Sequence, residues 1–383
     1  MAPRPTSSPA ASSPTPTRRL VGWAGGLVLV GLVGVLVGCS DPAAPGGTEN
    51  PFTQLECTVP DREIVSGGVP PDGIPSLEDP PFVGASHASL DYLRDEDRVI
   101  GLYLGGQAWA VPHNVGWWHE IVNMAVPGGP DLAVSYCPLT GSSLTFDRQV
   151  VGGASLGVSG LLFRNNLIMF DRTNDRSLWF QMARGSRCGT ATGTPISMVA
   201  SWDLRWDAWR EMHPDTRVVS GDLGMGRDYT RYPYGNYELS SELLFNFAGV
   251  DDSRFVKERV LGVPEDDGGG VLFPFGALRE VESDGVSVVR DVARGGDVVV
   301  FWKSRASGAM AYRPQSAGQR LTFQVEDGEI RDQETGSTWR LDGLAVAGPL
   351  AGDRLEPLAD AFTAFWFAWR AFYPESRIWE GGG

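Results

Sequence analysis

Cys137 lies at a turn between two strand-like runs in the segment AVSYCPLTGSSLTFDR, residues 133–148. Upstream, the segment WWHEIVN, residues 117–123, contains His119, Glu120 and Asn123. A cysteine acts as a nucleophile only as a thiolate, so it needs a base, a cation or oriented amide donors nearby. If WWHEIVN is helical, Asn123 lies one turn from His119 and could orient its ring. The pattern predicts a catalytic site with Cys137 as thiolate, His119 as base, and Asn123 or Glu120 orienting His119.

Two other interpretations use the same region. Cys137 and His119 with His113 would form a soft nitrogen and sulfur site for copper or, with a carboxylate, zinc, although the chain has no Cys-x-x-Cys or His-x-x-x-His spacing. Free cysteine is also among the most often buried residues, so Cys137 could simply be part of the core. Trp117 and Trp118 are candidate platforms for an envelope ligand. The sequence names no substrate and no cofactor.

The N-terminus predicts export. Arg18 and Arg19 precede an apolar run that ends in LVGC at Cys39, which resembles a bacterial lipoprotein signal. We therefore expect a signal peptide over residues 1–38 and membrane attachment through a lipidated Cys39, with a membrane-spanning anchor as the alternative. Removal of the three arginines in residues 1–38 changes the formal charge from −15 to −18. Such an acidic chain has no basic field for nucleic acid, so we exclude that partner.

Three cysteines remain in the exported chain, namely Cys57, Cys137 and Cys188. In an oxidising envelope this number predicts one disulfide and one free thiol. A Cys57–Cys188 bond would leave Cys137 free, whereas a Cys137–Cys188 bond would make Cys137 structural. The spacing does not decide between the two.

An internal repeat organises the rest of the chain. Trp202, Trp206 and Trp209 are spaced by four and three, which predicts a helix over residues 201–213, capped by Ser201 and ended by Pro214. This stretch aligns with residues 361–381, and Trp209 then matches Trp369. Further pairs of aligned segments are 98–104 with 259–265, 133–148 with 298–313, and 169–179 with 329–339. Two copies of one unit are therefore predicted, over residues 98–222 and 259–381.

We expect an α+β fold, mainly antiparallel β, because short strand-like runs alternate with turn residues. Each copy would end in its Trp-rich helix, and the copies would pack with pseudo-twofold symmetry. The expected division of the chain is a signal peptide at 1–38, a flexible tether at 39–60, the first copy at 61–250, and a second, degenerate copy at 251–383. In the second copy Cys137 is matched by Trp302, and residues 274–285 lack histidine and asparagine. Chemistry is therefore predicted in the first copy.

Several long motifs resemble an uncharacterised prokaryotic family, the domain of unknown function numbered 3179. They are GGVPPDGIP from residue 67, WWHEIVN, SYCPLTG, SGLLFRNNLIMFDR from residue 159, and FWFAWRAFYPES from residue 365. The resemblance covers nearly the whole exported chain and implies an exported or lipid-anchored protein. It supports the choice of Cys137 and His119 but implies no activity. Many members have Cys-Pro-Leu-Cys where this chain has Thr140 as the last residue, which weakens a two-sulfur site here.

Overall fold

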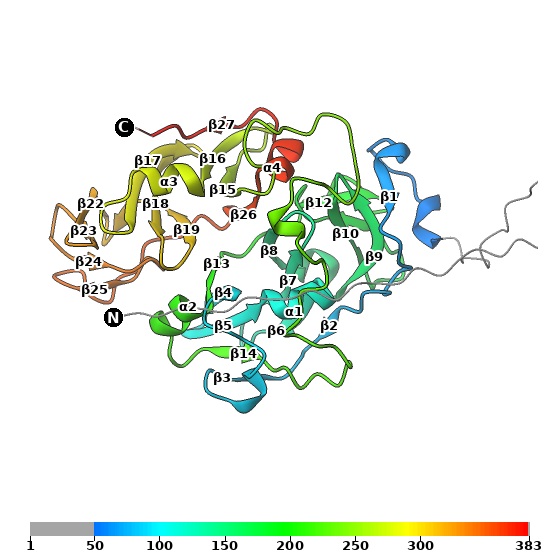
Figure 1. Ribbon diagram of the computed structural model, residues 1–383, viewed down its shortest axis with the longest axis horizontal. Helices are drawn as coiled ribbons and strands as arrows, with labels where there is room; N and C mark the ends of the chain where they lie inside the picture. Colours follow the sequence, from blue (N-terminus) through cyan, green and yellow to red (C-terminus); the bar gives the residue numbers. More distant parts are fainter. Residues whose placement is uncertain (1–49, 382–383) are drawn as a thin grey trace, which may run out of the picture. The chain divides into compact units, whose positions relative to one another are not determined.

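The computed structural model describes residues 50–381 (Figure 1). The predicted signal peptide, Cys39 and the tether up to residue 49 lie outside the described residues. Within them the fold is mainly antiparallel β with four short helices, as expected. No helix in residues 50–381 has the length and hydropathy needed to cross a membrane.

An eight-stranded sheet runs through the middle of the described residues. Its order is β2-β6-β7-β8-β26-β15-β16-β27, and β26 pairs with β8 on one side and β15 on the other. Strands from the first and last thirds of the chain thus share one sheet (Figure 1). The bounds are β2 (Leu77–Glu78), β6 (Ile121–Ala125), β7 (Asp131–Cys137), β8 (Ser142–Asp147), β26 (Phe362–Phe365), β15 (Arg259–Pro264), β16 (Gly270–Pro274) and β27 (Arg377–Ile378).

Two five-stranded sheets hold most of the remaining strands of the first predicted copy. One has the order β13-β4-β5-β14-β3, and the other has the order β1-β9-β10-β11-β12. The bounds are β13 (Trp202–Arg205), β4 (Arg98–Leu104), β5 (Gln107–Pro112), β14 (Arg217–Val219), β3 (Phe82–Gly84), β1 (Ile64–Ser66), β9 (Leu156–Phe163), β10 (Asn166–Asp171), β11 (Leu178–Phe180) and β12 (Gly185–Cys188).

The second predicted copy adds three smaller sheets. Their orders are β17-β18-β19, β20-β21 and β22-β23-β24-β25. The bounds are β17 (Val286–Ala293), β18 (Gly296–Lys303), β19 (Gly308–Tyr312), β20 (Gln315–Ser316), β21 (Gln319–Arg320), β22 (Phe323–Glu326), β23 (Glu329–Asp332), β24 (Thr338–Trp339) and β25 (Ala345–Ala347).

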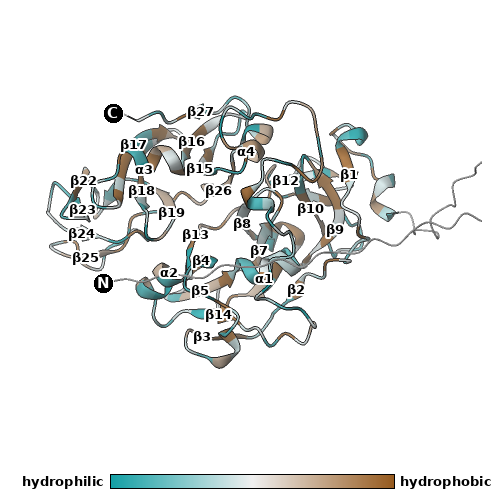
Figure 2. Ribbon diagram, in the orientation of Figure 1, coloured by the Kyte–Doolittle hydropathy of each residue, from teal (hydrophilic) through white to brown (hydrophobic). Residues whose placement is uncertain are grey.

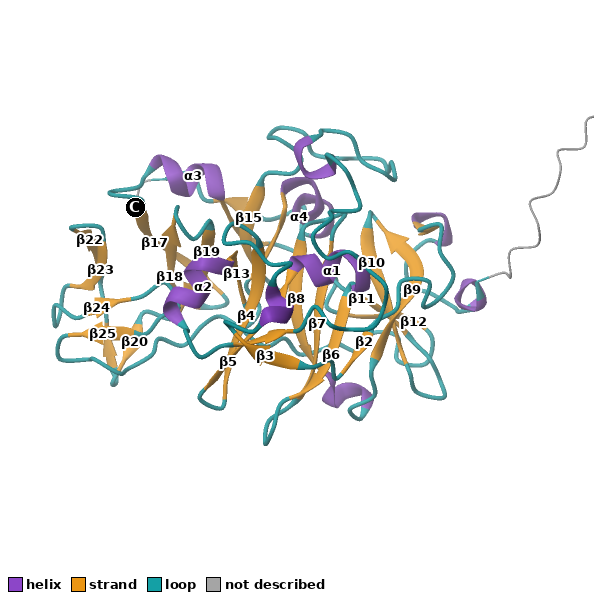
Figure 3. Ribbon diagram, turned by 60° about the horizontal axis from the view of Figure 1, so that its bottom comes forward, coloured by secondary structure: helices purple, strands orange, loops and turns teal. Residues whose placement is uncertain are grey.

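The helices are short and lie against the sheets (Figure 3). They are α1 (His113–His119), α2 (Trp206–Met212), α3 (Phe275–Glu280) and α4 (Trp366–Phe372), with 3-10 turns η1 (Pro51–Gln54), η2 (Asp61–Glu63), η3 (Ala88–Leu90), η4 (Arg148–Val151) and η5 (Tyr237–Leu239).

The predicted helix at residues 201–213 starts later than expected. Ser201 does not cap it, because residues 202–205 form β13, whose residues pair with β4. The helix proper, α2, begins at Trp206 and has no side-chain cap. The spacing of Trp202 fits a helix, but its backbone pairs with Gly101 of β4 instead. Its side chain is buried in this strand, so burial of the indole does not require a helix.

The tryptophans of α2 and α4 are buried in the core. Trp209 lies over Gly101 of β4, and Trp369 lies over Gly262 of β15. The Trp209 indole donates to Thr216 Oγ1 at 3.0 Å, and the Trp369 indole donates to Ser376 Oγ at 3.1 Å. Figure 2 shows the apolar residues concentrated on the strands.

A long segment with little regular structure, residues 222–258, connects β14 to β15 and passes close to α1 (Figure 1). We call it the strap. Tyr229 of the strap bonds to His119, and Tyr237 donates to Leu139 O at 2.9 Å. The strap therefore covers the segments that carry the predicted catalytic residues.

The N-terminal end of the described residues packs against the β1–β12 sheet. Phe52 is buried there, and Cys57 forms a disulfide with Cys188 of β12. Cys137 is the free cysteine among the described residues. Of the two pairings left open by the sequence, the structure has Cys57–Cys188.

Candidate functional site

Cys137 ends β7 and is fully buried. Its thiol donates to the backbone oxygen of Asn165 at 3.6 Å, a length typical of a weak sulfur donor. Burial, together with the nearby Glu120 carboxylate, raises the pKa of the Cys137 thiol to about 11. At neutral pH this side chain is a thiol, so the structure gives little support to a thiolate at this position.

His119 ends α1 with both ring nitrogens engaged. Nδ1 lies 2.8 Å from Pro75 O, and Nε2 lies 2.8 Å from the hydroxyl of Tyr229. Burial lowers the pKa of the His119 imidazole, which favours the neutral ring. A neutral ring donates through one nitrogen and accepts through the other, so these two bonds use its whole capacity.

The expected helical relation between His119 and Asn123 is wrong. The helix ends at His119, Glu120 has a positive φ of 56°, and Asn123 lies on β6. The Asn123 amide donates to Leu156 O at 2.9 Å and accepts from Leu156 N at 2.9 Å. A side chain that forms both bonds holds β6 to β9 instead of orienting His119.

Glu120 is the unusual carboxylate of this region. Its side chain is buried. Burial raises the pKa of Glu120 to about 8. Its φ of 56° is strained for a residue with a Cβ. A positive φ and a buried acid of raised pKa in one residue are features of functional positions.

His113 belongs to a different cluster, centred on Asp203 of β13. Arg98 Nε donates to Asp203 Oδ1 at 2.7 Å, and Ser143 Oγ donates to Asp203 Oδ2 at 2.5 Å. His113 Nε2 lies 3.3 Å from Asp203 Oδ1, and its ring lies tilted against Tyr136 with 3.9 Å between centroids. Burial alone would raise the pKa of Asp203, but Arg98 and His113 hold it well below the usual range.

A pocket of about 370 Å³ opens beside this cluster, and we call it the arginine pocket. It lies where β4 and β15 begin, at Arg98 and Arg259. Its other lining residues are Glu96, Asp97, His113, Trp117, Arg205, Glu238 and Ser307. Pockets of this size that combine an aromatic side chain with a few polar groups are common sites for small ligands.

Most charges around the pocket are already paired. Arg259 bonds to Glu238 of the strap at 2.8 Å, and Arg205 pairs with Asp207 at 2.9 Å. Two buried nitrogens of the lining residues have no hydrogen-bond partner: Nε1 of Trp117 and Nη1 of Arg259. The third buried nitrogen, Nε2 of His113, faces the Asp203 carboxylate. Buried polar groups are seldom left unbonded, so the nitrogens of Trp117 and Arg259 require an explanation.

The two candidate platform tryptophans have different positions. Trp117 lines the arginine pocket, whereas Trp118 does not and has the guanidinium of Arg227 over its ring at 5.2 Å. Both indole nitrogens are buried without a partner. Trp117 is therefore the one positioned to contact a ligand in this pocket.

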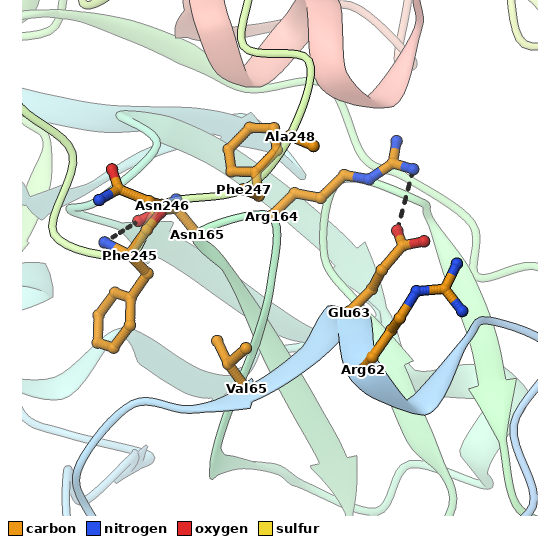
Figure 4. A pocket seen from close by; sticks show the side chains of 9 residues that line it. All are labelled: Arg62, Glu63, Val65, Arg164, Asn165, Phe245, Asn246, Phe247 and Ala248. Carbon is orange, nitrogen blue, oxygen red and sulfur yellow. Dashed lines mark hydrogen bonds and ion pairs between the residues drawn. The ribbon is translucent and has the colours of Figure 1, made fainter.

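Another pocket, of about 350 Å³, lies between η2, β1 and the strap (Figure 4). Arg164 points across it to Glu63, with 3.1 Å between Nη2 and Oε2. The Asn165 amide bonds to the backbone of Phe245 in both directions. None of the buried polar atoms of its lining residues lacks a partner, so we consider this pocket the weaker candidate.

The alternative metal site is not assembled. Within residues 50–381 no three His, Cys, Asp or Glu side chains come together as a metal-ligand group. His113 contacts Asp203, His119 is held by Pro75 and Tyr229, and Cys137 bonds to Asn165. The three proposed ligands thus have separate environments.

The spacing of residues in the sequence did not predict the charged residues of this pocket. Arg98, Arg259, Asp203 and Glu238 come from four separated segments, and no spacing links them. The alignment of residues 98–104 with 259–265 does pair Arg98 with Arg259, and that was the available signal.

The fold and site define a β-rich α+β protein with a charged pocket where β4 and β15 begin. Residues 71–376 match the family described as a protein of unknown function, DUF3179, and the chain belongs to that family. The searches of curated proteins and of solved structures found no match for this chain.

Proposed function

We propose that this protein is an exported, lipid-anchored protein that binds a small ligand in the arginine pocket. The observation that carries the binding function is the pair of unpartnered buried nitrogens on Trp117 and Arg259 beside a pocket of about 370 Å³. A ligand that bonds to them would remove the cost of leaving them unpaired, which is about 1–3 kcal/mol for each group.

The binding function is tested with full-length protein in detergent and a chemically diverse library of small molecules. We expect a subset of compounds to raise the unfolding temperature of the wild type, because a ligand of the folded state stabilises it. Trp117→Ala should abolish these shifts. Trp118→Ala is the matched control, because its neighbouring indole does not line the pocket, and it should retain them. A library without any Trp117-dependent compound would contradict the proposal.

Attachment through Cys39 is supported by the LVGC sequence at the end of the apolar run. It is tested by labelling cells with a radioactive or clickable fatty acid. The wild type should incorporate the label and sediment with membranes, and Cys39→Ala should lose both properties. Labelling that persists in Cys39→Ala would contradict this part of the proposal.

We also propose that residues 98–222 and 259–381 are two copies of one unit. Matched contacts support this, since Trp179 donates to Asp171 and Trp339 to Asp332, each at 2.8 Å. An experimental structure tests the duplication. The two ranges should superpose strand by strand, and different strand orders would refute it.

Thiolate catalysis by Cys137 is the second hypothesis, with His119 as base. It has less support, because the thiol is fully buried and the pKa of Cys137 is raised to about 11. The rate at which the Cys137 thiol reacts with iodoacetamide in the folded protein tests this hypothesis.

A further inference from the structure

We infer that the hydroxyl of Tyr232, on the strap, is a third group that bonds to the ligand of the arginine pocket, and that residues 230–236 close over the bound ligand. This inference rests on the proposed binding function and adds a ligand-binding residue and a closing segment to it. Its starting point is the Tyr232 hydroxyl, which is buried and has no hydrogen-bond partner within residues 50–381. Buried tyrosine hydroxyls usually have a partner, so this one requires an explanation.

Tyr232 lies next to residues that line the pocket. Its ring packs edge-on against the Trp117 indole, with 5.0 Å between centroids. Burial raises the pKa of Tyr232, and the charges that act most on this pKa after burial are those of Glu238 and Arg259. Trp117, Glu238 and Arg259 all line the pocket. The Tyr232 hydroxyl therefore belongs to the same cluster as the two unpartnered nitrogens of Trp117 and Arg259.

The strap is fixed on both sides of Tyr232. On the N-terminal side, the buried Tyr229 bonds to His119 Nε2 at 2.8 Å. On the C-terminal side, Tyr237 is buried in the core. The residues between these two anchors are exposed, apart from Tyr232 and Tyr234, which are partly buried. A short exposed loop between two fixed points can move toward a ligand without unfolding the rest of the strap.

The three unpartnered groups require hydrogen-bond acceptors from the ligand. The nitrogens of Trp117 and Arg259 can only donate, whereas the Tyr232 hydroxyl can donate or accept. The charge of Arg259 is already balanced by Glu238 at 2.8 Å, so the cluster requires acceptor atoms and not a net charge. A polar ligand with neighbouring acceptor atoms, charged or neutral, satisfies all three groups.

The hydrogen bond is tested with Tyr232→Phe, which removes the hydroxyl and keeps the ring against Trp117. The probes are the library compounds that stabilise the wild type and have no effect on Trp117→Ala, and we call them Trp117-dependent compounds. Their affinities for full-length protein in detergent are measured by calorimetry. Tyr232→Phe should weaken their binding about three- to tenfold, the loss expected for one hydrogen bond.

Tyr234→Phe is the matched control on the same stretch of the strap. After burial, the pKa of Tyr234 is affected most by Glu120 and Cys137, and neither residue lines the pocket. This variant should therefore bind the Trp117-dependent compounds like the wild type. Unfolding temperatures establish that both variants are folded.

Closure of the strap is tested on the wild type by limited digestion with trypsin. Arg231 precedes Tyr232 and is exposed, so trypsin can cleave between them. With a Trp117-dependent compound at about ten times its dissociation constant, about a tenth of the protein is unbound, and cleavage after Arg231 should slow about tenfold. Cleavage after the exposed Arg320 of β21 should keep its rate, which separates closure of the strap from general stabilisation.

Trp117-dependent compounds that bind Tyr232→Phe as tightly as the wild type would overturn the assigned hydrogen bond and leave the binding function standing. Unchanged cleavage after Arg231, or equal slowing after Arg231 and Arg320, would overturn closure of the strap. If the library contains no Trp117-dependent compound, the proposed function fails, and this inference fails with it. The two kinds of failure are therefore distinguishable.

Discussion

At the scale of single residues, the contrast between Glu120 and Glu282 is informative. Glu282 accepts from the indole of Trp302 at 2.6 Å, and Trp302 is the residue aligned with Cys137. Near Glu120 the corresponding side chain is the short thiol of Cys137, whose pKa is raised by burial and in part by the Glu120 carboxylate.

The reactivity of Cys137 is the first prediction at this scale. With a fully buried thiol of raised pKa, the folded protein should react with iodoacetamide at pH 7 at least about 100-fold more slowly than free cysteine. Mass spectrometry of the Cys137 peptide measures this. Unfolding in guanidinium should restore the normal rate, which serves as the control. Rapid labelling of the folded protein would instead support the thiolate hypothesis.

Glu120 predicts a pH dependence of stability. Its pKa rises from 4.5 to about 8 on folding, so between these values the folded protein keeps a proton that the unfolded chain has lost. The free energy of unfolding should therefore fall as pH increases through this window. Glu120→Gln should lack this fall and be more stable than the wild type at pH 8, by about 1–3 kcal/mol.

Urea denaturation at pH 5 and pH 8 measures the effect of Glu120→Gln. The exposed Glu375 provides the matched variant, Glu375→Gln, which should keep the wild-type dependence. A Glu120→Gln protein whose stability changes with pH as the wild type does would show that Glu120 is not the buried acid responsible.

At the scale of elements, each Trp-rich helix is placed by a glycine on the strand beneath it. A Cβ at Gly101 would lie 2.5 Å from the Trp209 ring, and one at Gly262 would lie 2.2 Å from the Trp369 ring. Neither glycine needs a positive φ, so what requires glycine is the close approach of the indole. Both indoles are fully buried, and the rings cannot move aside without opening the core.

Gly101→Ala should therefore destabilise the protein by about 1–3 kcal/mol, the usual cost of overpacking a core. The control is Gly84→Ala on β3, where an added Cβ meets no atom within 4 Å. Denaturant unfolding of both variants checks the expectation. A loss of stability that is no larger for Gly101→Ala than for Gly84→Ala would contradict it.

At the scale of the whole described body, the eight-stranded sheet and the disulfide connect distant parts of the chain. β26 lies between β8 and β15, so the strands of the two predicted copies are joined edge to edge. The Cys57–Cys188 bond spans 131 residues and ties the N-terminal segment to β12. Unfolding of one copy would therefore disrupt the other, and we expect a single cooperative transition.

Loss of this disulfide should cost about 2–5 kcal/mol, because the bond restricts the unfolded chain across a long loop. The double variant Cys57→Ser/Cys188→Ser should unfold at a lower temperature than the wild type, and reduction should bring the wild type down to the same value. Cys137→Ser is not disulfide-bonded and should still respond to reduction. A wild-type midpoint that does not change under reducing conditions would show that the bond contributes little.

The sequence by itself determined the strand pattern, the Trp-rich helices, the family and the expectation of one disulfide and one free thiol, whereas the structure decided that Cys57 pairs with Cys188. Alternation, turn residues and motifs act over a few positions, so they can be read along the chain. The α2 boundary was placed too early, because pairing of Trp202 with Gly101 of β4 is a non-local contact.

The tertiary structure decided the site. His119 and Asn123 have the right residue types for a catalytic group, but the positive φ of Glu120 ends α1 between them and turns the chain into β6. Arg98 and Arg259 are 161 residues apart in the numbering and meet only because β4 and β15 begin at one pocket. Which side chains share a pocket depends on packing between distant segments, and local residue patterns do not contain that information.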